Sequence, residues 1–187
     1  MSPKDWIPLR WSAGPLDVAV RKDISAGDKE ALLASLKPES LGVLQGSPFN
    51  CVVLNWGAGK PEDSAQRDAL KLLIAAAKAR GLDVVGQVTG EPDSAALTAA
   101  RDAGLSAVLL EKSAKGAPLP VIALSGPAEA GRTTSPLVAL KDCEWPSVRT
   151  GKSGNAESGP TGYPWVDSSG WMSQLARSVA PAGTAIW

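Results

Sequence analysis

The feature that most constrains the fold is an alternation of apolar, β-branched runs with segments of helical period. Residues 50–56 (NCVVLNW) form an apolar run, which is typical of a strand buried on both faces of a parallel sheet. The next segment, about 62–80, carries apolar residues three and four positions apart, which predicts a helix that Gly81 closes. Repetition of this pattern predicts strand-helix-strand units with right-handed parallel crossovers.

The pattern extends over the whole chain. We predict strands at residues 7–11, 50–56, 83–88, 106–111, 121–124, 137–141 and 184–187. We predict helices at residues 25–36, 62–80, 92–103 and 168–179, and a long Gly/Ser/Pro-rich surface loop at about 151–164. About seven strands favour a TIM-barrel-like (β/α) fold, truncated or atypical because no eighth unit follows, with an open doubly wound parallel sheet as the alternative.

Size and composition exclude several classes of protein. A chain of 187 residues is long enough for one hydrophobic core, so we expect a single β/α domain over 1–187. Nineteen basic residues balance nineteen acidic ones, which argues against nucleic acid as a partner. No apolar run approaches the length of about 20 residues that a membrane helix needs. The oligomeric state stays open.

The absence of histidine removes the commonest general base and the commonest nitrogen ligand for metals. We therefore expect no metal site and no cofactor. Cys51 and Cys143 each lie beside an apolar run, which favours two buried free thiols over a disulfide. The N-terminal residues lack the apolar core of a signal peptide, which leaves open a cytoplasmic location or secretion with a leader removed.

Ligands of parallel α/β sheets bind at the carboxyl ends of the strands, and the predicted strands become polar or aromatic there. The chain has seven tryptophans against one tyrosine and one phenylalanine, and three predicted strands end in tryptophan. Indole faces stack on sugar rings, which favours a saccharide ligand, whereas the alternative is that these rings fill the core. The candidate substrate-binding residues are Trp11, Asn55, Trp56, Gln87, Trp145, Trp165 and Trp171.

Two carboxylates are the candidate catalytic residues. Glu111 follows a predicted strand, and burial there would suit it to donate a proton, with Asp142 or Glu144 as the second carboxylate. Two carboxylates about 5 to 9 Å apart suit glycoside hydrolysis. The alternative is that Glu111 and Asp142 are solvated charges beside Lys112 and Lys141.

Two short motifs resemble phosphate-binding loops. Residues 57–59 (GAG) lie between a predicted strand and a helix, as in a dinucleotide fingerprint, but Glu62 occupies the third glycine position and would repel a pyrophosphate. Residues 151–153 (GKS) resemble the end of a P-loop, but Pro146 stands where the upstream glycine is needed. A nucleotide-binding α/β protein is therefore only a third hypothesis.

Residues 158–171 (SGPTGYPWVDSSGW) place aromatic rings between rigid Pro and Gly turns, either over a pocket or turned inward to cover the end of a barrel. With residues 46–56 (GSPFNCVVLNW), this segment resembles poorly characterised bacterial proteins with a glycosidase-like TIM barrel. The resemblance implies that fold and an association with carbohydrate. Retaining glycosidases place an Asn-Glu pair after the fourth strand, whereas Leu110 precedes Glu111 here. We expect a carbohydrate-associated, glycoside-hydrolase-like domain, with a noncatalytic binding or scaffold domain as the alternative.

Overall fold

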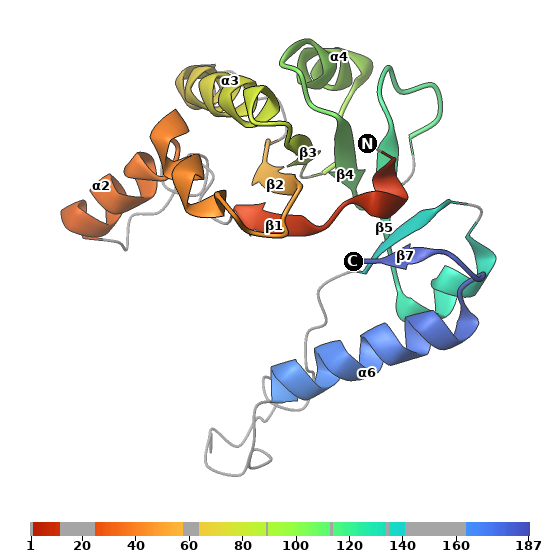
Figure 1. Cartoon of the computed structure of the whole chain (residues 1–187). Coiled ribbons are helices and arrows are strands. Elements are labelled where there is room, and N and C mark those ends of the chain that lie inside the picture. Colours follow the sequence, from red (N-terminus) through yellow and green to blue (C-terminus); the bar gives the residue numbers. More distant parts are fainter. Residues whose placement is uncertain are drawn as a thin grey trace, which may run out of the picture. The chain divides into compact units, whose positions relative to one another are not determined.

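The computed structural model describes residues 2–11, 25–57, 64–88, 90–112, 114–133, 135–140 and 164–187 (Figure 1). The chain forms two units, Met1–Ala123 and Leu124–Trp187. Strand β5 (Val121–Ser125) contributes residues to both units. The single domain predicted over 1–187 stays a prediction.

The predicted alternation of strands and helices is confirmed within the described residues. The strands are β1 (Pro8–Trp11), β2 (Cys51–Asn55), β3 (Asp83–Gln87), β4 (Ala107–Leu110), β5, β6 (Leu137–Leu140) and β7 (Ala185–Ile186). The α-helices are α2 (Ala26–Ala34), α3 (Ser64–Ala79), α4 (Ser94–Asp102) and α6 (Pro164–Val179). The 3-10 helices are η1 (Pro3–Asp5), η2 (Pro38–Leu44) and η4 (Pro127–Arg132).

Proline explains most of the differences from the predicted boundaries. Pro38 ends the first predicted helix, but it also opens η2, because a proline lacks only an N–H that the first helical turn leaves unpaired. Pro127 opens η4 in the same way. Helix α6 begins at Pro164 rather than at residue 168, so the last residue of the predicted loop and the three residues after it are helical.

All pairs of described strands are parallel, and neighbouring strands follow the sequence order from β1 to β7. The chain is therefore an α/β protein with a parallel sheet, as predicted. In β5, Val121–Ala123 pair with β4, and Leu124 and Ser125 pair with β6.

The core of the first unit lies between the strands and the helices that cover one of their sides. Helices α3 and α4 lie on the same side of β2, β3 and β4 (Figure 1). The buried core joins residues of β2, β3 and β4 to residues of η2, α3 and α4, among them Leu44, Val52, Leu54, Leu73, Val84, Leu97 and Val108. We call this the helix side of the sheet.

Gly86 in β3 is required by the packing on the helix side. A Cβ atom at this position would lie 2.5 Å from Leu105 Cδ1 and 3.1 Å from Trp56 Cβ. The first distance is an overlap, and the second is shorter than an ordinary contact between carbon atoms. Glycine thus lets the ring of Trp56 and the chain before β4 approach the strand.

The second unit is held together by contacts of α6 with η4 and by the pairing of β6 with β7. Ala130, Val138 and Ala176 form its small buried cluster. At Gly131 a Cβ atom would lie 3.0 Å from the carbonyl oxygen of Val179, so the absence of a side chain permits the close approach of η4 to α6.

Candidate functional site

Three polar side chains meet at the carboxyl ends of β1, β2 and β3. Successive residues of a strand point to opposite sides, and Trp56 lies in the core of the helix side, so Asn55 points to the other side. Asn55 is paired in register with Gln87, and the guanidinium of Arg10 donates a hydrogen bond to Gln87 Oε1. We call Arg10, Asn55 and Gln87 the carboxyl-edge cluster.

The surroundings of the carboxyl-edge cluster are partly apolar. Asn55 and Gln87 are half-buried, whereas Arg10 is exposed. Leu109, which is in register with Gln87, is buried, as is Val85 two residues before Gln87 in β3. Two carboxamides and one guanidinium beside an apolar surface supply several donors and at least two acceptor oxygens. This combination suits a ligand that offers both hydrogen-bond donors and acceptors.

The two tryptophans at these strand ends lie on the helix side, away from the carboxyl-edge cluster. Trp56 is 2% exposed, and the guanidinium of Arg67 in α3 lies 5.9 Å from the centre of its ring, within the range of a cation–π contact. Trp11 is half-buried against the same core, and its indole nitrogen donates a 2.9 Å hydrogen bond to the carbonyl oxygen of Ser35. These positions favour the core-filling interpretation of both rings.

Glu111 follows β4 and is exposed, so the burial that would suit it to proton transfer is not found. Nearby, Lys112 Nζ donates a 2.6 Å hydrogen bond to Glu91 Oε1, between two exposed side chains. The hydrogen bond and the charge of Lys112 lower the pKa of Glu91, and the hydrogen bond and the charge of Glu91 raise the pKa of Lys112. The alternative of solvated strand-end charges therefore fits the described part of this region, and the catalytic role of Glu111 stays a prediction.

Several predicted site residues fall where the structure says nothing of them. Asp142, Glu144 and Trp145 lie outside the described residues. Trp165 and Trp171 belong to α6, at positions where only the backbone is described. The structure thus brings Asn55 and Gln87 together on one side, places Trp11 and Trp56 on the other, and leaves the remaining predicted site residues untested.

The sequence does not reveal the contact of Arg67 with Trp56, because this contact arises only when α3 packs on β2. The only sequence signal is a basic residue in the early part of the helix that follows a strand ending in tryptophan. Arg10 was recognisable as a strand-end residue, but its hydrogen bond to Gln87 joins strands that are not adjacent and was not predictable.

Within the part of the chain that the structure describes, no three His, Cys, Asp or Glu side chains form a group that could hold a metal ion. Among the same residues, no helix has both the length and the apolar character needed to cross a bilayer. Comparison with protein-family models, curated proteins and solved structures finds no match to this chain.

Proposed function

We propose that the chain is a TIM-barrel-like domain that binds a saccharide at the carboxyl-edge cluster. The observation that carries the proposal is that Arg10, Asn55 and Gln87 lie at the carboxyl ends of three consecutive parallel strands, where Asn55 is in register with Gln87 and Arg10 donates a hydrogen bond to Gln87. This is the end at which ligands of parallel α/β proteins bind.

The strand order supports the barrel-like part of the proposal. The described strands are parallel and neighbour one another in sequence order, which is the order around a (β/α) barrel. A doubly wound sheet reverses its order at a switch point, and no reversal occurs among the described strands.

The chemistry of the cluster supports a saccharide. Each sugar hydroxyl both donates and accepts a hydrogen bond, and a carboxamide can do both at once. The hydrogen bond from Arg10 holds the amide of Gln87 in one orientation, which reduces the entropy lost when a ligand binds. Leu109, which is in register with Gln87 and 7% exposed, offers a small apolar surface to the C–H groups of a sugar ring.

A more specific proposal is that the domain hydrolyses glycosides, with Glu111 and Asp142 as acid and base. Binding at the carboxyl-edge cluster does not depend on it, because neither carboxylate belongs to the cluster. A noncatalytic binding domain would retain saccharide affinity and release no reducing sugar.

The test is a titration of the full chain with a panel of cello-, xylo-, malto- and chito-oligosaccharides, followed through the side-chain amide signals of Asn55 and Gln87 in ¹⁵N-correlated NMR spectra. We expect Gln87→Ala to weaken binding by about tenfold, the effect of removing one or two hydrogen bonds. The matched control is Gln174→Ala, which changes an exposed glutamine of α6.

The outcomes separate saccharide binding from glycoside hydrolysis. Absence of any shift at Asn55 and Gln87 over the whole panel would overturn saccharide binding. Release of reducing sugar by the wild type but not by Glu111→Gln would establish hydrolysis, and binding without release would establish the noncatalytic form.

A further inference from the structure

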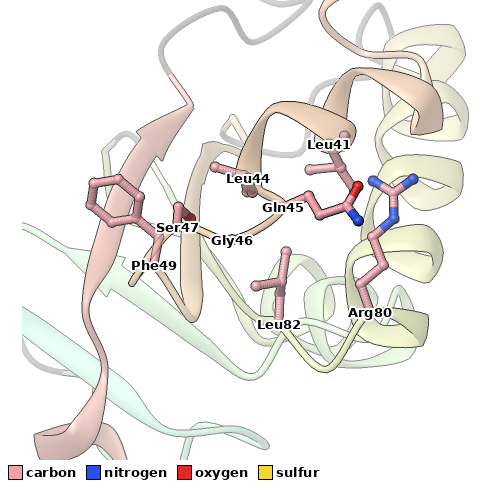
Figure 2. A pocket seen from close by; sticks show the side chains of 9 residues that line it. Leu41, Leu44, Gln45, Gly46, Ser47, Phe49, Arg80 and Leu82 are labelled. Carbon is pink, nitrogen blue, oxygen red and sulfur yellow. The ribbon is translucent and has the colours of Figure 1, made fainter.

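A pocket of about 390 Å³ lies at the amino ends of β2 and β3, the ends opposite to the carboxyl-edge cluster (Figure 2). Its walls come from η2 and the turn after it, from Phe49 just before β2, and from residues 80–82 between α3 and β3. The volume falls in the range of about 300 to 1,000 Å³ that is typical of sites for small molecules. Neither the sequence patterns nor the proposed saccharide site accounts for this pocket.

The body of the pocket is apolar and well supported. Leu41 is 1% exposed and Leu44 is buried, and both belong to the core of the first unit. Phe49 and Leu82 are half-buried and pack against the same core. In Figure 2, Leu82 points into the pocket from the connection between α3 and β3. A preformed wall of this kind binds an apolar group at a small entropic cost.

Three polar side chains of the lining make no hydrogen bond or ion pair with another described residue. Ser47 Oγ is buried and makes no hydrogen bond in the described part of the chain. Gln45 and Arg80 are exposed, and neither side chain has a hydrogen bond or ion pair within the described residues. In Figure 2 the amide of Gln45 and the guanidinium of Arg80 extend toward one another at one end of the pocket. A buried hydroxyl without a partner destabilises a folded protein, and a ligand group that reaches it would remove that penalty.

The charge of the lining selects an anion. Arg80 is the one ionisable side chain among the described residues that line the pocket, so these residues carry a single positive charge. A guanidinium binds one carboxylate through two parallel hydrogen bonds, whereas a doubly charged phosphate calls for further cations that this lining does not provide.

We propose that this pocket binds a small monocarboxylate with an apolar body. The carboxylate pairs with the Arg80 guanidinium and accepts a hydrogen bond from the Gln45 amide. The apolar body lies against Leu44, Phe49 and Leu82. This site is independent of the proposed saccharide site, because the two lie at opposite ends of β2 and β3 and share no residue.

The test uses the full chain and three probes that share one apolar body: 3-phenylpropionate, 3-phenylpropan-1-ol and 3-phenylpropylamine. Binding is followed by ¹⁵N-correlated NMR at the backbone amides of Gly42, Gln45 and Gly46 and at Arg80 Nε. We expect these signals to shift with the acid, and we expect the acid to bind about tenfold more tightly than the alcohol and the cationic amine to bind most weakly.

Variants of the arginine separate recognition of the carboxylate from apolar binding. Arg80→Gln should weaken binding of the acid by about tenfold and leave the alcohol unchanged, and Arg80→Lys should fall between Arg80→Gln and the wild type. Arg101→Gln is the matched control, because Arg101 is an exposed arginine in the last turn of α4. It should not change the affinity for any probe.

Three results would overturn the proposal: no shift at the pocket amides, equal affinity for the acid, the alcohol and the amine, or unchanged affinity for the acid in Arg80→Gln. Each concerns signals at the amino ends of the strands. Failure here is therefore distinguishable from failure of saccharide binding, which is monitored at Asn55 and Gln87.

Discussion

The indole nitrogen of Trp6 donates a 2.6 Å hydrogen bond to Asp83 Oδ2, although the two residues are 77 positions apart. Ser106 Oγ donates to the other carboxylate oxygen over 2.8 Å and accepts from the backbone N–H of Val84 over 3.3 Å. One carboxylate at the start of β3 therefore connects the N-terminal segment to the residue that precedes β4. Asn50 adds a second connection, because its amide bonds the backbone of both Asp5 and Ile7.

We predict that Asp83→Ala lowers the free energy of unfolding by about 2 kcal/mol or more, because it leaves the donors of Trp6 and Ser106 without their acceptor. Trp6 is only 6% exposed, so water replaces the lost acceptor poorly. Urea unfolding followed by circular dichroism measures the change. Asp102→Ala removes a carboxylate from an exposed ion pair with Arg101 and should cost less than about 0.5 kcal/mol. Equal losses in the two variants would contradict the prediction.

We predict that Gly86→Ala destabilises the protein by about 1 to 3 kcal/mol, because the added Cβ overlaps Leu105 Cδ1 and crowds Trp56 Cβ. Leu105 can change rotamer, but the Cβ of Trp56 moves only with its backbone. Gly42→Ala is the control, since nothing lies within 4 Å of a Cβ at that position. Thermal unfolding should show a lower midpoint for Gly86→Ala alone, and a similar midpoint in both variants would refute the packing argument.

The thiol of Cys51 should be unreactive in the folded protein. Cys51 is fully buried at the start of β2, and burial, with a smaller effect of the Asp83 charge, raises its pKa from 9.0 to about 12. In a Cys143→Ser background, Ellman's reagent at pH 8 should react with Cys51 only as fast as the chain unfolds, and at once in guanidinium chloride. Rapid reaction of the native protein would show that the thiol is accessible.

The raised pKa of Cys51 also predicts a pH dependence of stability. The folded state keeps a proton that the unfolded chain releases above about pH 9. The contribution of the protonated Cys51 thiol to the stability of the folded state is therefore complete below about pH 9 and is lost as the pH rises from 9 toward 12. Replacement by Ala should flatten the fall in unfolding free energy over this interval, measured by urea unfolding at a series of pH values. An unchanged slope would count against the assigned pKa.

The ion pair between Glu91 and Lys112 should change the pKa values of the two side chains more than it changes the stability of the fold. Because the hydrogen bond and charge of Lys112 lower the pKa of Glu91, the pair stabilises the folded state at neutral pH, and this contribution disappears as the pH falls through the pKa of Glu91. We expect Lys112→Gln to raise the pKa of Glu91 in a carboxyl-detected NMR titration, whereas Lys115→Gln should not. Concentrated salt should act in the same direction as Lys112→Gln, because both side chains are exposed.

The strand order along the chain was predictable because each buried strand is a short apolar run bounded by Gly, Pro or polar residues. The side of the sheet to which each strand-end residue points was not predictable from the sequence. In β2 the residues Val52, Val53 and Leu54 are apolar on both sides, so the sequence shows no alternation from which to place Asn55 and Trp56. The pocket beside Arg80 was also hidden, because its walls come from a 3-10 helix and from a connection that meet only in the folded unit.

The opposite orientations of Asn55 and Trp56 bear on which changes of chain length β2 can accept. A residue inserted or deleted within Cys51–Asn55 would exchange the two sides of everything that follows in the strand. An amide would then enter the core beneath α3, and a large indole would take its place beside Gln87. A substitution in β2 affects one side of the sheet at a time. A change in the length of β2 would disturb the core packing of Trp56 and the position of Asn55 beside Gln87 together. We therefore expect natural variation in chain length to fall in the connections between elements.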